Sequence, residues 1–220
     1  GNISVGNNGL GIYASKKTGN AKIDVINGTH TVGDNSAIGI FGENIDINIS
    51  GGFTIGINTS FGIVSKGDGD IASNGDIAIG NSSIGIYKIG GSGDITVGAG
   101  TFTVDKKGYG IYATETSGTI TNNANISLEE SAIGIYSNGT NTIHNSGVIT
   151  VGKTSFGPDG NPGTTGDNIN SVGIFMSGGT TVSNTGIINV NETLSVGVYS
   201  AEKGNLFINQ ASGIINVDNG

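Results

Sequence analysis

The chain has 220 residues, of which 42 are glycine and 2 are proline, and it contains neither cysteine nor tryptophan. Its formal net charge of -8 leaves no basic footprint for nucleic acid, and no apolar run approaches the ~20 residues that a membrane-spanning helix needs. Glycine without proline or a G-X-Y period excludes collagen, and the many isoleucines and valines argue against a disordered linker.

One short pattern recurs along the chain: an aliphatic residue, a glycine, a second aliphatic residue and an aromatic residue. "SAIGIF" at 36–41 returns as "SSIGIY" at 82–87 and "SAIGIY" at 131–136. Successive spacings of the central glycines are 28, 23, 23, 25, 24, 39 and 24 residues. These glycines are Gly11, Gly39, Gly62, Gly85, Gly110, Gly134, Gly173 and Gly197. A period of this length predicts a solenoid.

Two further apolar elements lie between successive patterns. One is a pair of apolar residues separated by a single residue, such as Ile77 and Ile79, or Phe102 and Val104; the other is a position about eight residues earlier, such as Ile71 and Ile120. A period of two indicates strands, and no helical period is visible. The sequence therefore predicts an all-β parallel β-helix over 1–220, with 8-9 coils of 23-25 residues and three short strands per coil.

Alternation within each strand predicts which side chains face inward. In Ile38-Gly39-Ile40-Phe41 we expect both isoleucines inside, and the glycine and the phenylalanine outside. The same rule places Ile40, Ile86, Ile111 and Ile135 in the core. It also predicts an outer column formed by Tyr13, Phe41, Val64, Tyr87, Tyr112, Tyr136, Phe175 and Tyr199. Of this column, Tyr87, Tyr112 and Tyr136 are candidate ligand contacts, with a stiffening ladder of rings as the alternative.

Three asparagines and two histidines have predicted structural places. Asn122, Asn145 and Asn184 should turn inward at a corner and bond to one another from coil to coil. His30 occupies a core slot that matches Phe53 and Phe102, and His144 lies on the opposite, outer face of its strand. Neither histidine has the neighbours of a metal site or a catalytic triad.

The 39-residue spacing marks an insertion at about 152–170. It contains both prolines, and a loop of this kind on a solenoid often carries recognition. Phe156, Asp159, Asn161 and Asp167 are the candidate ligand-binding residues of this loop. A passive surface loop is the alternative.

Catalytic, metal and cofactor sites are not predicted. "KGDGD" at 66–70 lacks the spacing of a calcium-binding roll or an EF-hand. Polysaccharide lyases and hydrolases also use β-helices, but we expect no group of three or four carboxylates at equivalent positions of neighbouring coils. Asp68, Asp70 and Asp76 come nearest to such a group, and they occupy turns.

Repeats of "x-x-I-G-I-Y" alternating with "N-x-G-x-I-x-V-G", without cysteine, resemble passenger domains of type V autotransporters, most of all the large outer-membrane adhesins of fusobacteria. The resemblance implies a right-handed β-helix that is one piece of a larger passenger on the bacterial cell surface. The passenger would reach the membrane only through a barrel outside this segment. Implied partners are proteins or glycans of host cells or other bacteria, with no nucleic acid. The segment itself is expected to be monomeric, and a spacer rod is the alternative function.

Overall fold

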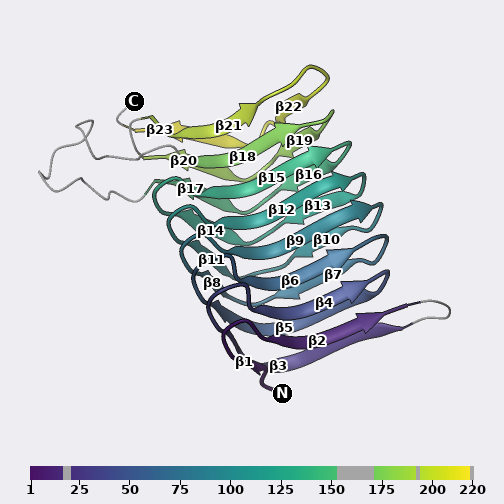
Figure 1. Ribbon diagram of the computed structural model, residues 1–220. Coiled ribbons are helices and arrows are strands. Elements are labelled where there is room, and N and C mark those ends of the chain that lie inside the picture. Colours follow the sequence, from purple (N-terminus) through teal and green to yellow (C-terminus); the bar gives the residue numbers. More distant parts are fainter. Residues whose placement is uncertain (17–20, 153–170, 192–193, 219–220) are drawn as a thin grey trace, which may run out of the picture.

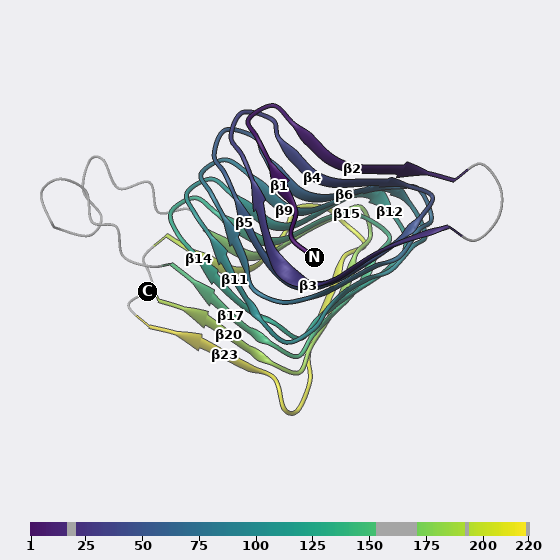
Figure 2. The same cartoon turned by 90° about the horizontal axis from the view of Figure 1, so that it is seen from below.

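The computed structural model is a parallel β-solenoid of about eight coils, and the predicted right-handed parallel β-helix is confirmed. It describes residues 1–16, 21–152, 171–191 and 194–218. The coils stack along one axis from the N-terminal coil, drawn in purple, to the C-terminal coil, drawn in yellow (Figure 1). Viewed from below, each coil follows nearly the same outline as the coil beneath it (Figure 2).

Each coil contributes one strand to an eight-stranded parallel sheet. Its members are β2 (Leu10–Ser15), β4 (Ile38–Glu43), β6 (Phe61–Lys66), β9 (Ile84–Gly91), β12 (Tyr109–Thr116), β15 (Ile133–Gly139), β18 (Val172–Ser177) and β21 (Val196–Ser200). Equivalent residues pair across neighbouring coils, as Ile86, Ile111 and Ile135 do. Each recurrence of the sequence pattern (aliphatic, glycine, aliphatic, aromatic) therefore forms one strand of this sheet.

The other two strands of each coil belong to a second, 15-stranded sheet. One row consists of β7 (Ile71–Asn74), β10 (Ile95–Val97), β13 (Thr119–Asn122), β16 (Thr142–Asn145), β19 (Thr181–Asn184) and β22 (Leu206–Asn209). The other row consists of β8 (Ile77–Ile79), β11 (Thr101–Val104), β14 (Asn125–Leu128), β17 (Val148–Val151), β20 (Ile187–Val190) and β23 (Ile214–Val217). Near the N-terminus the two rows join, because β3 (Lys22–Val32) and β5 (Asp46–Ile55) each run through both; β1 (Ser4–Val5) pairs with β3.

The core is a set of aliphatic columns with isolated rings between them. Ile40, Ile86, Ile111 and Ile135 are each 0 % exposed, as predicted. Facing them across the coil are inward pairs such as Ile77 with Ile79, which are also buried. Because apolar burial contributes roughly 25 cal/mol per Å², these columns hold the sheets together.

The glycines of the recurring pattern do not lie outside, so this part of the prediction is wrong. Gly39 is buried next to the buried Ile40, while Ile38 is only half-buried. The alternation of the strand thus breaks between Gly39 and Ile40. A Cβ on Gly39 would meet Val32 Cγ2 at 2.9 Å and Phe53 Cε1 at 3.1 Å. Glycine is needed here because the Cβ would also lie 2.6 Å from Gly62 O of the neighbouring strand, and a backbone atom cannot move aside as the end of a side chain can.

The asparagine ladder is confirmed. Asn122 Nδ2 donates to Asn145 Oδ1 at 2.8 Å, and Asn145 Nδ2 donates to Asn184 Oδ1 at 2.7 Å. Asn184 Nδ2 extends the ladder to Asn209 Oδ1 at 2.8 Å. Each of these amides also donates to a carbonyl in its own turn. The corner is thereby hydrogen-bonded along the solenoid axis and within each coil.

The two histidines also have defined places, and the sheet keeps its register on both sides of the insertion. His30 is 0 % exposed and pairs with Phe53 as predicted, and His144 is exposed on the outer face of β16. Ile133 of β15 pairs with Val172 of β18, although 39 residues separate them. The register of the eight-stranded sheet therefore continues across residues 153–170, which lie outside the described part of the chain.

The close approach at the glycines gives a direct test. A Cβ on Gly85 would lie 2.7 Å from both Gly110 O and Ile79 Cδ1. We expect Gly85→Ala to lower the free energy of unfolding by about 1–3 kcal/mol through overpacking, measured by urea denaturation. Gly6→Ala is the control, because a Cβ there meets nothing within 4 Å. Equal stability of the two variants would contradict the inward orientation.

Candidate functional site

The predicted candidate residues fall into two groups. Tyr87, Tyr112 and Tyr136 lie at equivalent positions of β9, β12 and β15, so the fold brings them together on the outer face of the eight-stranded sheet. Phe156, Asp159, Asn161 and Asp167 belong to the insertion at 152–170, and all four lie outside the described residues. The outer face is thus the predicted site whose geometry can be described.

The aromatic column is a ladder of rings along the solenoid axis. Tyr112 and Tyr136 stack with ring centroids 4.4 Å apart and planes at 6°, and Tyr136 stacks on Phe175 at 5.0 Å and 14°. Tyr87 meets Tyr112 edge to face, at 5.2 Å and 77°. Where rings stack face to face, each ring covers the face of its neighbour. The column therefore presents ring edges and hydroxyl groups to the outside.

A second outer column was missed by the sequence analysis. It lies beside the aromatic column because the first aliphatic residue of each pattern points outward. Its members are Leu10, Ile38, Phe61, Ile84, Tyr109, Ile133, Val172 and Val196, which pair from strand to strand. Tyr109 contacts Tyr112 edge to face at 5.0 Å, and Phe61 stacks on Tyr87 at 5.8 Å. The signal was present in the sequence, since aromatic residues replace aliphatic ones at this position.

These two columns make one half-exposed apolar face, which we call the aromatic face. Burial raises the pKa of Tyr112 to about 12, and the neighbouring phenols of Tyr136 and Tyr109 act in the same direction. The phenol of Tyr112 is therefore neutral under ordinary conditions and both donates and accepts hydrogen bonds. The face offers apolar contact with polar tips, the combination that is enriched at protein interfaces.

A polar corner lies inside the coil, behind the turn that follows the eight-stranded sheet. Lys88 of β9 is 0 % exposed. Its Nζ donates to Ser65 Oγ at 3.2 Å, to Gly67 O at 2.7 Å and to Gly69 O. Burial lowers the pKa of Lys88, and the carboxylates of Asp70 and Asp68 oppose that shift. All three ammonium protons thus have acceptors, two of them carbonyls of a glycine-rich turn.

The polar groups of this corner have different hydrogen-bond partners in a later coil. Ser65, Lys88, Ala113 and Ser137 form one inward column. At Ser137 the turn itself supplies a donor, because Asn141 Nδ2 donates to Ser137 Oγ at 2.8 Å. The turn at 66–70 has glycines where such a side chain would stand. Lys88 therefore supplies from the strand the donors that the turn lacks.

Three carboxylates do stack at equivalent positions of neighbouring coils, so the sequence-based expectation was wrong on this point. They are Asp46, Asp70 and Asp94, each of which precedes a paired isoleucine. Asp46 Oδ1 accepts the backbone N–H of Asp70 at 3.0 Å, and Asp70 Oδ1 accepts that of Asp94 at 2.8 Å. The sequence did carry a signal for this column, because each aspartate directly precedes an isoleucine at the same apolar position of its coil.

The hydrogen bonds of these carboxylates indicate a structural role. Each binds the backbone of the next coil, and Asp94 Oδ1 likewise accepts the N–H of Thr119 at 2.7 Å. Hydrogen bonds from the N–H and hydroxyl of Ser92 lower the pKa of Asp68. Within the part of the chain that the structure describes, no group of three or more His, Cys, Asp or Glu side chains is arranged to hold a metal ion.

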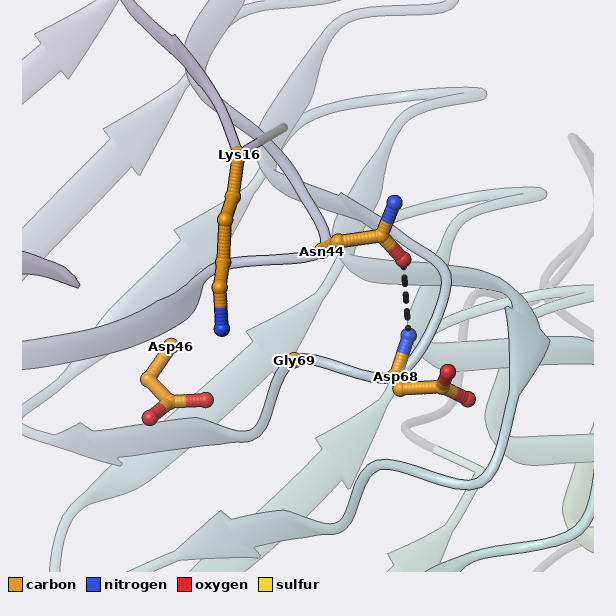
Figure 3. A pocket seen from close by; sticks show the side chains of 5 residues that line it. All are labelled: Lys16, Asn44, Asp46, Asp68 and Gly69. Atoms are coloured by element: carbon orange, nitrogen blue, oxygen red, sulfur yellow. Dashed lines mark hydrogen bonds between the residues drawn. The ribbon is translucent and has the colours of Figure 1, made fainter. Parts of the chain in front are cut away.

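A shallow polar depression opens on the surface of this corner. Lys16, Asn44, Asp46, Asp68 and Gly69 line it, and the N–H of Asp68 donates to Asn44 Oδ1 at 3.3 Å (Figure 3). Lys16 projects into the depression from the edge opposite Asp68 (Figure 3). Asp46 Oδ1 and Asp68 Oδ1 each accept a backbone N–H of the next coil, from Asp70 and Ser92 respectively.

The fold and the site define a class of protein: a parallel β-solenoid with one aromatic outer face. Among the described residues, none forms a helix of the length and apolarity that a membrane span requires.

A family model described as the BigA third pectate lyase-like domain matches residues 129–220, which is less than half of the chain. No curated protein and no solved structure matches the chain. The matched part begins just before β15 and includes the later members of the asparagine ladder, Asn145, Asn184 and Asn209.

Lys88 provides a test of the polar corner. We expect Lys88→Met to lower the free energy of unfolding by about 1–3 kcal/mol, because it leaves the buried Gly69 carbonyl without its donor. Urea denaturation measures the change. Lys66→Met is the matched control, since Lys66 is exposed and its ion pair with Glu43 lies at the surface. A Lys88→Met protein as stable as the wild type would show that desolvating the ammonium cancels its three hydrogen bonds.

Proposed function

We propose that the chain is a segment of a bacterial cell-surface adhesin that contacts its target through the aromatic face. The observation that supports this proposal is the pair of half-exposed columns that runs the length of the eight-stranded sheet. A solenoid that repeats one contact surface along its axis gains avidity from many weak contacts. The partner is a protein or glycan on the surface of a host cell or another bacterium.

Similarity supports the class of this proposal. The family model that matches residues 129–220 is named for BigA, an autotransporter-type adhesin. A passenger segment of that kind is exported and displayed at the cell surface. A β-solenoid suits display because each coil is stabilised by its neighbours and needs no disulfide.

The geometry of the rings limits how a partner can contact the aromatic face. A sugar that stacks on an aromatic residue needs an open ring face, but the rings from Tyr112 to Phe175 cover one another. A partner on this stretch would meet ring edges and hydroxyls, which favours a protein surface or the polar rim of a glycan. The insertion at 152–170, with Phe156, Asp159, Asn161 and Asp167, is a second candidate contact.

A spacer rod is the second candidate function, and the same stacking favours it. Rings that cover each other stiffen the stack whether or not a ligand binds. The segment would then hold a distal binding region away from the cell. Binding experiments on the purified chain separate the two functions.

We expect the triple variant Tyr87→Val, Tyr112→Val and Tyr136→Val to bind target cells at least tenfold more weakly than the wild type. Valine is chosen because Val64 occupies the same column. The matched control changes Thr54, Thr103 and Thr150 to valine. These threonines belong to one outer column of the other sheet, in which Ala78 and Ser127 separate them. Cell-adhesion and glycan-array assays measure the difference.

Replacing the same three tyrosines by phenylalanine keeps the stack and removes the hydroxyls, so it separates the two contributions. A deletion of residues 154–168 tests the insertion in the same assays. Undiminished binding by the valine variant would exclude the aromatic face as the contact. Absence of binding by the wild-type chain to any tested surface would favour the spacer.

The proposal includes no catalytic activity. A structural role for Asp46, Asp70 and Asp94 is supported by their hydrogen bonds to the backbone of the next coil. We expect no cleavage of pectate or other acidic polysaccharides by the purified chain, measured by release of reducing or unsaturated ends. Cleavage that Asp68→Asn or Asp70→Asn abolishes would contradict this proposal.

A further inference from the structure

His30 is a titratable side chain in an apolar column of the core. It lies on the inner face of β3, in register with Phe53 of β5, and the next two residues of the column are Ile77 and Phe102. The imidazole is 0 % exposed, and its centroid lies 4.7 Å from that of the Phe53 ring. Histidine thus takes a place that the following coils fill with rings or branched aliphatic side chains.

The two ring nitrogens have different surroundings. Nδ1 accepts the backbone N–H of Ile3 at 3.2 Å, so Nδ1 carries no proton and the neutral ring is protonated on Nε2. Nε2 is buried and has no hydrogen-bond partner. It points toward Gly51, where an added Cβ would lie 3.0 Å from it. The slot accepts a neutral imidazole and offers no acceptor for a second proton.

Protonation would therefore disrupt the first coil in two ways. A proton on Nδ1 replaces the lone pair that holds Ile3, which anchors the segment leading into β1. It also places an unpaired charge among apolar side chains, which is strongly unfavourable. Burial lowers the pKa of His30, and the ammonium of Gly1 acts in the same direction.

Carboxylates near these strands do not compensate that charge. Lys22 and Asp24 on β3 and Asp46 on β5 are exposed on the outer surface. Glu43 at the end of β4 forms an ion pair with Lys66. Asp24 likewise pairs with Lys22. The pKa of His30 is lower in the folded protein than in the unfolded chain, where it is about 6.5. The contribution of neutral His30 to the free energy of unfolding is therefore complete above the unfolded-state pKa and is lost as the pH falls toward the folded-state pKa.

We propose that His30 makes the coil containing β1 and β3 acid-sensitive, so that mild acid releases β1 from β3. The opened form takes up one proton that the closed form excludes. Its population therefore rises by up to about tenfold for each pH unit below 6.5.

Native-state hydrogen exchange on the 220-residue chain tests this at pH 7.5, 6.5 and 5.5, after correction for the intrinsic exchange rates. In the wild type we expect the opening constant of β1 and β3 amides to increase toward pH 5.5, while amides of β12 and β15 keep their protection. His30→Phe copies the residue found at Phe53 and Phe102 and should remove the increase. His144→Gln, which changes the exposed histidine, should retain it.

Nuclear magnetic resonance of the imidazoles gives a readout that needs no variant. In the folded protein the His30 ring should remain the neutral Nε2–H tautomer at pH 6.5. A His30 ring at least half protonated at that pH, with the β3 amides still protected, would overturn the proposal. An equal pH dependence of β1 and β3 exchange in the wild type and His30→Phe would also overturn it.

Discussion

Stacking in register at the spacing of a parallel sheet, ~4.8 Å, is the constraint on which this structure depends. Within the strands, each paired residue lies over its equivalent in the next coil, so each column must tolerate its own repetition. Aliphatic residues, rings and asparagine amides satisfy this requirement by packing or bonding to their copies. Aspartates satisfy it because each carboxylate faces the backbone N–H of the next coil, as Asp46 faces that of Asp70. Columns of like charge are then compatible with the fold.

Residues that depart from their column show where the constraint is relaxed. His30 stands among rings and aliphatic side chains, and Lys88 stands among serines and alanine. Both are fully buried and both have a local partner, Ile3 for the first and the carbonyls of the turn at 67–69 for the second. A single substitution in one coil is tolerated because its neighbours hold the register on both sides. Such positions can hold a single buried titratable side chain, which a column repeated in every coil could not.

Much of the fold could be predicted from the sequence, because period and alternation are local properties. The three strands per coil, the Asn122–Asn145–Asn184 ladder and the place of His30 all follow from spacing alone. The orientation of Gly39 could not be predicted, since it depends on how closely the facing strand approaches. The second outer column was missed although Phe61 and Tyr109 mark it in the sequence, because the predicted alternation placed the first aliphatic residue of each pattern inside. The partners of Lys88 lie in a turn of the preceding coil and carry no mark in the sequence.

The aromatic face and the insertion represent two ways in which a solenoid can vary. A face changes gradually, because each ring must stack on the next, and Val64 shows that one coil can lack a ring while Phe61 contacts Tyr87 beside it. A corner changes abruptly, because the register from Ile133 to Val172 continues although the connection between β17 and β18 is longer than the corresponding connections of the other coils. Under the proposed adhesin function, extended contact belongs on the faces and specific recognition belongs at the corners. A segment that carries both can combine weak contacts along its length with one distinctive contact at its side.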